Sequence, residues 1–281
     1  IDEVVILNNS ADTVTLDDGR VYLRGGLYET TLSTYPLANN GLVYTGTNFY
    51  VRVQEGNPLG ITWDGTHFWV VGYNLDTVYK YTSAGVYTGT SFSVSSQDGV
   101  PSCITWDGTY FWVIGSTNDT AYKYTSAGVY TGTSFSVASQ EVNPSGITWD
   151  GTHLWVVGST NDTAYKYTSA GVYTGTSFSV ASQDVTPQGI TWDGTHFWII
   201  GASSDRAYKY TSAGVYTGTS FSVGGQASSP TDIAWDGTNL WVIGTSSDRA
   251  FKYEQAVGIP SVSSAESGAS ALGGQNYVRV K

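Results

Sequence analysis

The residues best suited to acid–base or metal chemistry recur at a spacing of 43 positions. They are Asp64, Asp107, Asp150, Asp193 and Asp236, each before a glycine, and His67, His153 and His196, three residues after three of these aspartates. An Asp-Gly pair typically forms a tight hairpin turn, because glycine tolerates positive φ. Zinc needs several ligands within about 2 Å of one ion, and one histidine per repeat does not supply them. We therefore interpret both sets as turn residues.

A second acidic set lies in the polar segments between apolar runs. It comprises Glu55, Asp98, Glu141 and Asp184, together with Asp76, Asp119, Asp162, Asp205 and Asp248. Calcium takes about six to eight oxygen ligands, and one carboxylate pair per repeat does not ensure that enough oxygens converge. We expect solvated or turn-capping acids and no cofactor, with Ca²⁺ binding as the alternative.

The single cysteine and the absent motifs argue against two classes of chemistry. Cys103 is alone, so no internal disulfide forms. It occupies the repeat position held elsewhere by Gly60, Gly146 and Gly189, which indicates a small residue at the start of a strand. No G-x-S-x-G elbow, H-E-x-x-H pair or phosphate loop occurs. We predict from this that the chain is not an enzyme.

The elements that must position these residues follow from a tryptophan repeat. All ten tryptophans lie in one motif, typified by Gly-Ile-Thr-Trp-Asp-Gly-Thr-His-Leu-Trp-Val-Val at 146–157. They occupy two columns of that repeat, at Trp63, Trp106, Trp149, Trp192 and Trp235, and at Trp69, Trp112, Trp155, Trp198 and Trp241. Each repeat divides into four short strands, which in the first repeat are 60–63, 67–71, 78–81 and 86–94. A period in the forties with this content is typical of β-propellers.

The number of blades depends on how the segment before the first tryptophan is read. Residues 12–58 resemble a worn copy of the repeat, and 43–49 match 86–92 closely. We therefore predict an all-β, six-bladed β-propeller of four-stranded blades with a 43-residue repeat. The last repeat lacks its outer strand, which residues 1–7 or 277–280 would supply, with 1–7 preferred. The expected domains are an N-terminal strand at 1–11, the propeller at 12–256 and a C-terminal arm at 257–281.

Two resemblances refine this prediction. The pattern at 144–157, followed by Asn161-Asp162 and Tyr165-Lys166-Tyr167, resembles the NHL and YVTN-type propeller repeat over residues 12–253. The segments at 21–36 and 274–281 resemble parts of bacteriophage tail-fibre and other virion proteins. The first resemblance implies the fold, and propellers host many activities. The second implies a virion component exposed on the particle surface.

The net charge of −11 limits the partners. Nucleic-acid binding requires a basic face that displaces counterions, and this chain has no run of lysine or arginine. No apolar run approaches the roughly 20 residues that span a bilayer. We therefore expect neither nucleic-acid binding nor membrane insertion.

The repeats differ from one another mainly in two sets of loops, which the propeller topology places on one face of the disc. Binding surfaces on scaffolds are usually loops, although relaxed constraint on exposed loops is the alternative explanation of the differences. The candidate binding face consists of Tyr73, Asn74, Asp98, Asn118, Glu141, Asn143, Asn161 and Asp184.

These patterns favour a non-catalytic recognition or structural module on a phage particle. Its expected partners are a host cell-surface receptor or glycan and other virion proteins, in a homo-oligomer, on the virion or outside the cell. One alternative is a microbial secreted or surface lectin. The other is a metal-dependent propeller hydrolase of the lactonase type, whose central metal ligands we cannot assemble from these repeats.

Overall fold

The computed structural model describes residues 16–17, 20–23, 42–51, 54, 56–255 and 276–277. The chain divides into two compact units, Gly41–Gln255 and a second made of Ile1–Asn40 with Ala256–Lys281. In the second unit, β1 (Leu16–Asp17) pairs with β2 (Arg20–Leu23), which pairs with β23 (Asn276–Tyr277). No helix of membrane-spanning length and hydropathy occurs among the described residues.

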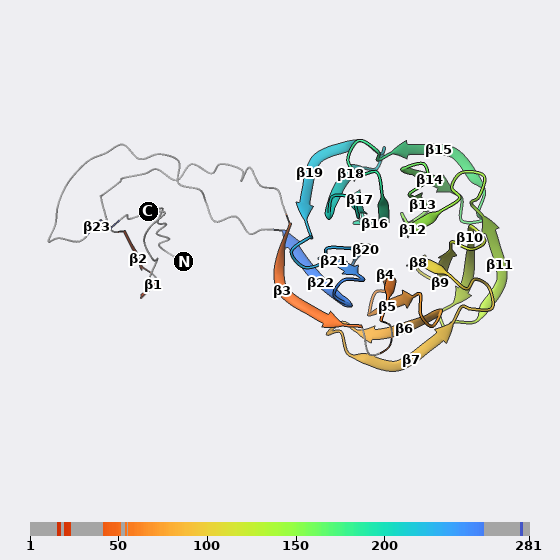
Figure 1. Ribbon diagram of the computed structural model, residues 1–281, viewed down its shortest axis with the longest axis horizontal. Helices are drawn as coiled ribbons and strands as arrows, with labels where there is room; N and C mark the ends of the chain where they lie inside the picture. Colours follow the sequence, from red (N-terminus) through yellow and green to blue (C-terminus); the bar gives the residue numbers. More distant parts are fainter. Residues whose placement is uncertain are drawn as a thin grey trace. The chain divides into compact units, whose positions relative to one another are not determined.

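The larger unit is a five-bladed β-propeller of four-stranded antiparallel blades (Figure 1). Blades 1 and 2 are β4 (Pro58–Trp63), β5 (His67–Gly72), β6 (Thr77–Thr82), β7 (Tyr87–Ser93), and β8 (Pro101–Trp106), β9 (Tyr110–Gly115), β10 (Thr120–Thr125), β11 (Tyr130–Ser136). Blades 3 and 4 are β12 (Pro144–Trp149), β13 (Leu154–Gly158), β14 (Thr163–Tyr167), β15 (Tyr173–Ser179), and β16 (Pro187–Trp192), β17 (His196–Gly201), β18 (Arg206–Thr211), β19 (Tyr216–Ser222). Blade 5 is β20 (Pro230–Trp235), β21 (Leu240–Gly244), β22 (Arg249–Gln255) and β3 (Leu42–Tyr50).

The prediction of six blades is therefore wrong, and so is the expected source of the closing strand. The 42–50 segment does not begin a blade of its own, because it pairs antiparallel with β22 and supplies the outer strand that the last repeat lacks. Tyr277 pairs with Tyr22 in the small sheet instead of closing the ring. The preferred closing segment, 1–7, lies outside the described residues. The all-β propeller of four-stranded blades is confirmed.

Aromatic packing between neighbouring blades closes the ring. Phe49 of β3 lies with its ring centroid 5.5 Å from those of Phe68 and Tyr81 in blade 1 and of Trp241 in blade 5. The same contact recurs around the disc, as in Trp69 of blade 1 with its centroid 4.7 Å from that of Phe111 in blade 2. The second tryptophan of each repeat is buried. Because one blade cannot cover both of its faces, stacking around the ring buries the core.

The repeated aspartates have the turn role that the sequence predicts. Asp64 Oδ1 accepts hydrogen bonds from the Thr66 and His67 amides at 2.8 and 2.7 Å. Its Oδ2 accepts a bond from Trp69 Nε1 at 2.7 Å. Gly65 has a φ of +97°, which suits glycine at this turn. This one carboxylate thus fixes the first hairpin and also pairs the polar atom of a buried tryptophan.

Candidate functional site

Each innermost strand begins with a β-bulge at the same end of the disc. In β12, Pro144 and Gly146 pair with adjacent residues of β13, so Ser145 between them has no cross-strand partner. The other four inner strands show the same register shift. A bulge re-aims the side chain of its extra residue and is common beside functional sites. The five bulge residues are Leu59, Ser102, Ser145, Gln188 and Thr231.

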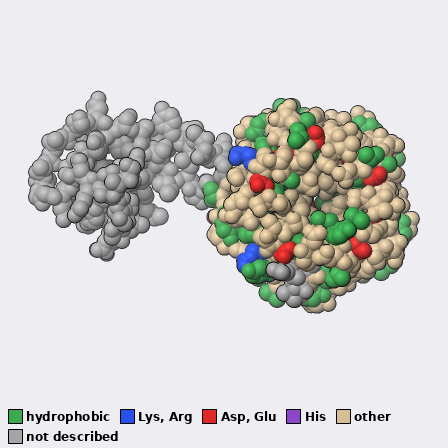
Figure 2. Space-filling model, in the orientation of Figure 1, with side chains coloured by type: hydrophobic (Ala, Val, Ile, Leu, Met, Phe, Trp, Pro, Cys, Tyr) green, Lys and Arg blue, Asp and Glu red, His purple; other side chains and the backbone are tan. Residues whose placement is uncertain are grey.

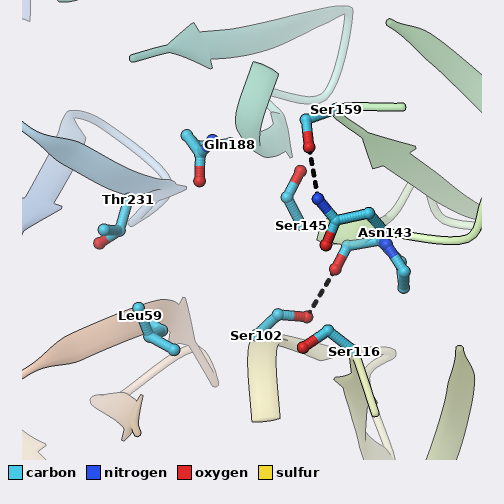
Figure 3. Close-up of a pocket in the computed structure, with 9 residues that line it drawn as sticks. Leu59, Ser102, Ser116, Asn143, Ser145, Ser159, Gln188 and Thr231 are labelled. Atoms are coloured by element: carbon cyan, nitrogen blue, oxygen red, sulfur yellow. Dashed lines mark hydrogen bonds between the residues drawn. The ribbon is translucent and has the colours of Figure 1, made fainter. Parts of the chain in front are cut away.

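The five bulge residues line a central pocket of about 160 Å³, which we call the axial pocket (Figure 3). Its wall is completed by Asn143 from the loop that joins two blades, by Pro144 at the start of β12, and by Ser116 and Ser159 from loops between the second and third strands. We call the end of the disc that carries these two kinds of loop the loop face. At about 30 Å³ for each water molecule, the pocket holds several waters or a small chemical group.

Hydroxyl groups of the bulge residues connect neighbouring blades. Ser102 Oγ donates to the Pro144 carbonyl at 2.8 Å, and Ser145 Oγ donates to the carbonyl of Pro187, also at 2.8 Å. Thr231 Oγ1 donates to the Pro58 carbonyl at 3.0 Å. The pocket wall is therefore held in place by hydrogen bonds between blades as well as by the sheets.

Three of the predicted binding-face residues are buried acids that hold the loops together. Asp98, Glu141 and Asp184 are at most 3% exposed. Asp98 accepts hydrogen bonds from the Val100 amide at 2.9 Å and the Asn118 amide at 3.1 Å, which joins two different loops. Burial opposes ionisation of Asp184, but hydrogen bonds from serine and threonine outweigh it and hold the pKa of this carboxyl below its usual value. These side chains position the loop face and present little surface to a partner.

The other five predicted residues are exposed, and one of them lines the axial pocket. Asn143 donates through Nδ2 to Ser159 Oγ at 2.7 Å across the pocket wall (Figure 3). Asn118 and Asn161 bond to neighbouring loop carbonyls through their side chains, and Tyr73 is 48% exposed. Asn74 is also exposed on the loop face.

The remaining acids of the sequence analysis have a backbone role in the loops. Asp76, Asp119, Asp162, Asp205 and Asp248 adopt left-handed conformations with φ between 45° and 50°. Glu55 lies outside the described residues. Within the described part of the chain, no three His, Cys, Asp or Glu side chains are grouped closely enough to hold a metal ion.

Sequence analysis missed a polar pair on the propeller axis, directly behind the axial pocket. Asp232 follows the pocket residue Thr231, and its Oδ2 lies 2.7 Å from the Ile61 amide of blade 1 and 3.2 Å from Cys103 Sγ of blade 2. Its Oδ1 is buried without a hydrogen-bond partner. A Cβ on Gly189 of blade 4 would lie 2.2 Å from that oxygen, so the glycine makes room for the carboxyl.

The environment of this pair alters its acid–base chemistry. Asp232 is 1% exposed, and burial raises the pKa of its carboxyl to about 8 despite the hydrogen bonds that it accepts. Burial and the nearby carboxyl also raise the pKa of the Cys103 thiol. At neutral pH, the propeller axis therefore holds an uncharged acid beside an uncharged thiol. The signal was present in the sequence, because this column reads Gly60, Cys103, Gly146, Gly189 and Asp232.

Comparison with known proteins identifies the fold and no family. No known family and no curated protein matches the chain. Glutaminyl cyclase from Myxococcus xanthus is similar in structure with a TM-score of 0.58 and 10% identity, over 81% of this chain and 97% of that one. Virginiamycin B lyase from Staphylococcus aureus gives a TM-score of 0.47 and 22% identity over 70% of this chain. The matched region spans 66% of the lyase, slightly under two thirds of its length.

These comparisons correct the prediction about enzymatic activity and limit the resemblance to propeller repeats to the fold. The inference that the chain is not an enzyme is wrong, because the glutaminyl cyclase shows that a propeller of this shape carries catalysis. Missing motifs and regular blades are therefore no argument against a reaction centre. The resemblance to propeller repeats is confirmed at the level of the fold, with five blades instead of six.

Proposed function

We propose that the chain is a ligand-recognition propeller whose axial pocket binds a small polar group of a larger ligand, such as one unit of a surface glycan. The observation that carries this proposal is where the repeats differ. The five bulge residues are leucine, two serines, glutamine and threonine. Two and four positions later, the same strands have isoleucine and tryptophan in all five copies. The strand framework is thus repeated, whereas its pocket-facing position varies.

The visible surface of the disc has no continuous patch of either charge (Figure 2). In the view of Figure 2, single acidic side chains are spread over the disc and basic ones appear only at its left edge, so neither sign forms a continuous patch. The loop face also exposes apolar side chains, since Leu75, Val142 and Val185 are 56–58% exposed. Ligand sites usually combine apolar surface with a few polar groups that fix the orientation of the ligand. Here the polar groups line the pocket, and apolar side chains are exposed on the same face.

The biological setting remains part of the proposal. The resemblance of the chain ends to phage proteins supports a virion or extracellular location, with a host cell-surface receptor or glycan as the partner. Contacts with other virion proteins and a homo-oligomeric assembly follow from the same setting. A microbial surface lectin uses the same pocket chemistry without the virion.

The test measures binding of the full chain to a glycan array and to host cells, with a filled pocket as the comparison. Gln188→Trp places a large ring in the axial pocket, and Thr176→Trp adds the same ring on the exposed rim strand β15. We expect Gln188→Trp to weaken binding at least tenfold and Thr176→Trp to leave it unchanged. Equal binding by both variants would exclude the pocket as the recognition site.

A catalytic use of the pocket is the second candidate function, and the axial carboxyl favours it. Asp232 follows a pocket-lining residue, and its raised pKa suits an acid that exchanges a proton near neutral pH. A panel of ester, lactone and glycoside substrates tests this candidate. Turnover by the wild-type chain that falls at least 100-fold in Asp232→Asn, but not in Cys103→Ala, would support it, and silence across the panel would remove it.

A further inference from the structure

We infer that the group bound in the axial pocket is a primary ammonium carried on a short alkyl or sugar carbon. This inference rests on the proposed function, because it uses the same pocket. It names the chemistry that distinguishes a preferred ligand from other small polar groups.

Four of the five hydroxyls that line the pocket have already committed their hydrogen atoms. A carbonyl oxygen can only accept, so each hydroxyl bonded to one must donate its single proton. Ser102, Ser145 and Thr231 donate to proline carbonyls of the next blade. Ser116 Oγ likewise donates to the Val100 carbonyl at 3.3 Å. These four oxygens can therefore offer a ligand only lone pairs.

The amide side chains add to this excess of acceptors. Asn143 uses Nδ2 for its bond to Ser159, and its Oδ1 has no hydrogen bond among the described residues. Gln188 points toward the pocket in Figure 3, and its amide has no hydrogen-bond partner within the described part of the chain. The Gln188 amide supplies two donor hydrogens and one acceptor, and the Ser159 hydroxyl keeps its hydrogen to donate. The four committed hydroxyl oxygens, Asn143 Oδ1 and Gln188 Oε1 still give more acceptors than donors around the pocket. An ammonium has three donors and no acceptor, which makes it the best match to this wall.

The charge balance favours a cation as well. Among the residues that the structure describes, no lysine or arginine lines the pocket, and the net charge of the chain is −11. Asp232 lies one residue behind the pocket wall, with Oδ1 buried and unpartnered. Ionisation of this carboxyl would supply the negative charge that a bound ammonium needs. The groups that contact it are the Ile61 amide, the Ile233 amide and, as the titratable neighbour among the described residues, Cys103.

Leu59 provides an apolar contact for the carbon skeleton of the ligand. Leu59 is the only aliphatic bulge residue, and it lies on one side of the pocket in Figure 3. Its side chain can cover the carbon that bears the ammonium. A compact polyol would place hydroxyl groups against Leu59 and would bring more hydroxyl oxygens than the few donors of the wall can pair.

The experiment compares matched ligands on the full chain by ligand-observed NMR and calorimetry in 150 mM salt. The probes are propylammonium against 1-propanol, and glucosamine against glucose and N-acetylglucosamine. We expect each ammonium probe to bind at least tenfold more tightly than its neutral partners. The ammonium probe that binds more tightly shows whether the natural ligand is an alkylamine or an amino sugar. Binding should be lost in Gln188→Trp and retained in Thr176→Trp, which excludes general attraction to an acidic protein.

A second readout involves the axial carboxyl. If Asp232 supplies the counter-charge, the affinity for propylammonium should rise several-fold between pH 6.5 and 8.5 in the wild type and stay constant in Asp232→Asn. Equal affinity for propylammonium and 1-propanol would overturn the inference. If neutral sugars bind in the pocket at least as well as glucosamine, the proposed function stands and the ammonium inference fails. If glycan binding survives Gln188→Trp and no probe binds, both fail.

Discussion

Replacing Asp232 by asparagine should stabilise the propeller at neutral and alkaline pH and leave its stability nearly unchanged in acid. Asparagine preserves the acceptor for the Ile61 amide and cannot ionise. In the folded chain the pKa of Asp232 is raised to about 8, whereas an exposed aspartate has an ordinary pKa of 3.8. The contribution of this raised pKa is therefore fully present below pH 3.8 and declines as the pH rises toward 8.

The magnitude follows from proton linkage. Between these two pKa values the folded state binds one more proton than the unfolded state, so stability falls by about 1.4 kcal/mol for each pH unit. From pH 4 to pH 7 the loss attributable to this one group amounts to roughly 4 kcal/mol. Asp232→Asn removes that loss. For a domain of this size, it should raise the melting temperature at pH 7 by roughly 10 °C.

The assay is urea or thermal unfolding of both chains from pH 4 to pH 9, followed by tryptophan fluorescence. Other carboxyl groups contribute equally to both curves, so the difference between them isolates Asp232. Glu254→Gln removes an exposed carboxyl of the same blade and should stay within about 0.5 kcal/mol of the wild type at every pH. A difference between wild type and Asp232→Asn that does not grow between pH 4 and pH 7 would refute the reasoning.

Three further predictions test the ring and its turns. Phe49→Ala should destabilise the propeller by about 3–5 kcal/mol in urea unfolding, because the ring of this closing strand is 7% exposed and packs between the last and first blades. Gly189→Ala should cost more than 1 kcal/mol, since its new Cβ would lie 2.7 Å from a backbone atom of blade 5, whereas Gly99→Ala meets nothing within 4 Å and should be near neutral. Asp193→Ala removes the acceptor 2.9 Å from Trp198 Nε1 and should cost about 3 kcal/mol at pH 7. Burial opposes ionisation of Asp193, but its hydrogen bonds hold its pKa below 3.8, so this difference should fade as the pH drops through the folded value.

The blades were predictable because the residues that pack between them recur at a constant spacing in the sequence. Trp155 and its equivalents recur every 43 residues, and each is buried against the next blade. The number of blades was not obtained, although both relevant signals are in the sequence. The 43–49 segment matches an outer strand, and the final repeat lacks that strand. Read together they describe one blade shared between the two ends of the ring, and this explains why 42–50 pairs with β22.

The site was harder to predict, for reasons that lie in the backbone. Asp98 occupies a variable loop and looks like a contact residue in the sequence, but the loop folds back so that its carboxylate caps two loop amides. Ser145 appears to be an ordinary strand residue, and only the register shift around it shows that it turns into the axial pocket. Neither the cap nor the bulge leaves a local pattern in the sequence, because both depend on pairing with a second segment.

The axis is the one place where a repeated ring can acquire a single, unrepeated site. On the outer strands, a substitution affects its own blade and at most the next one, as the contacts of Phe49 illustrate. On the axis the inner strands meet, so the carboxyl of Asp232 in blade 5 reaches the Ile61 amide in blade 1, Cys103 in blade 2 and the space left by the glycine of blade 4. One substitution there changes the environment that several blades share. We therefore expect functional divergence of such repeats to concentrate on inner-strand positions, and the bulge residues beside Asp232 are where this chain shows it.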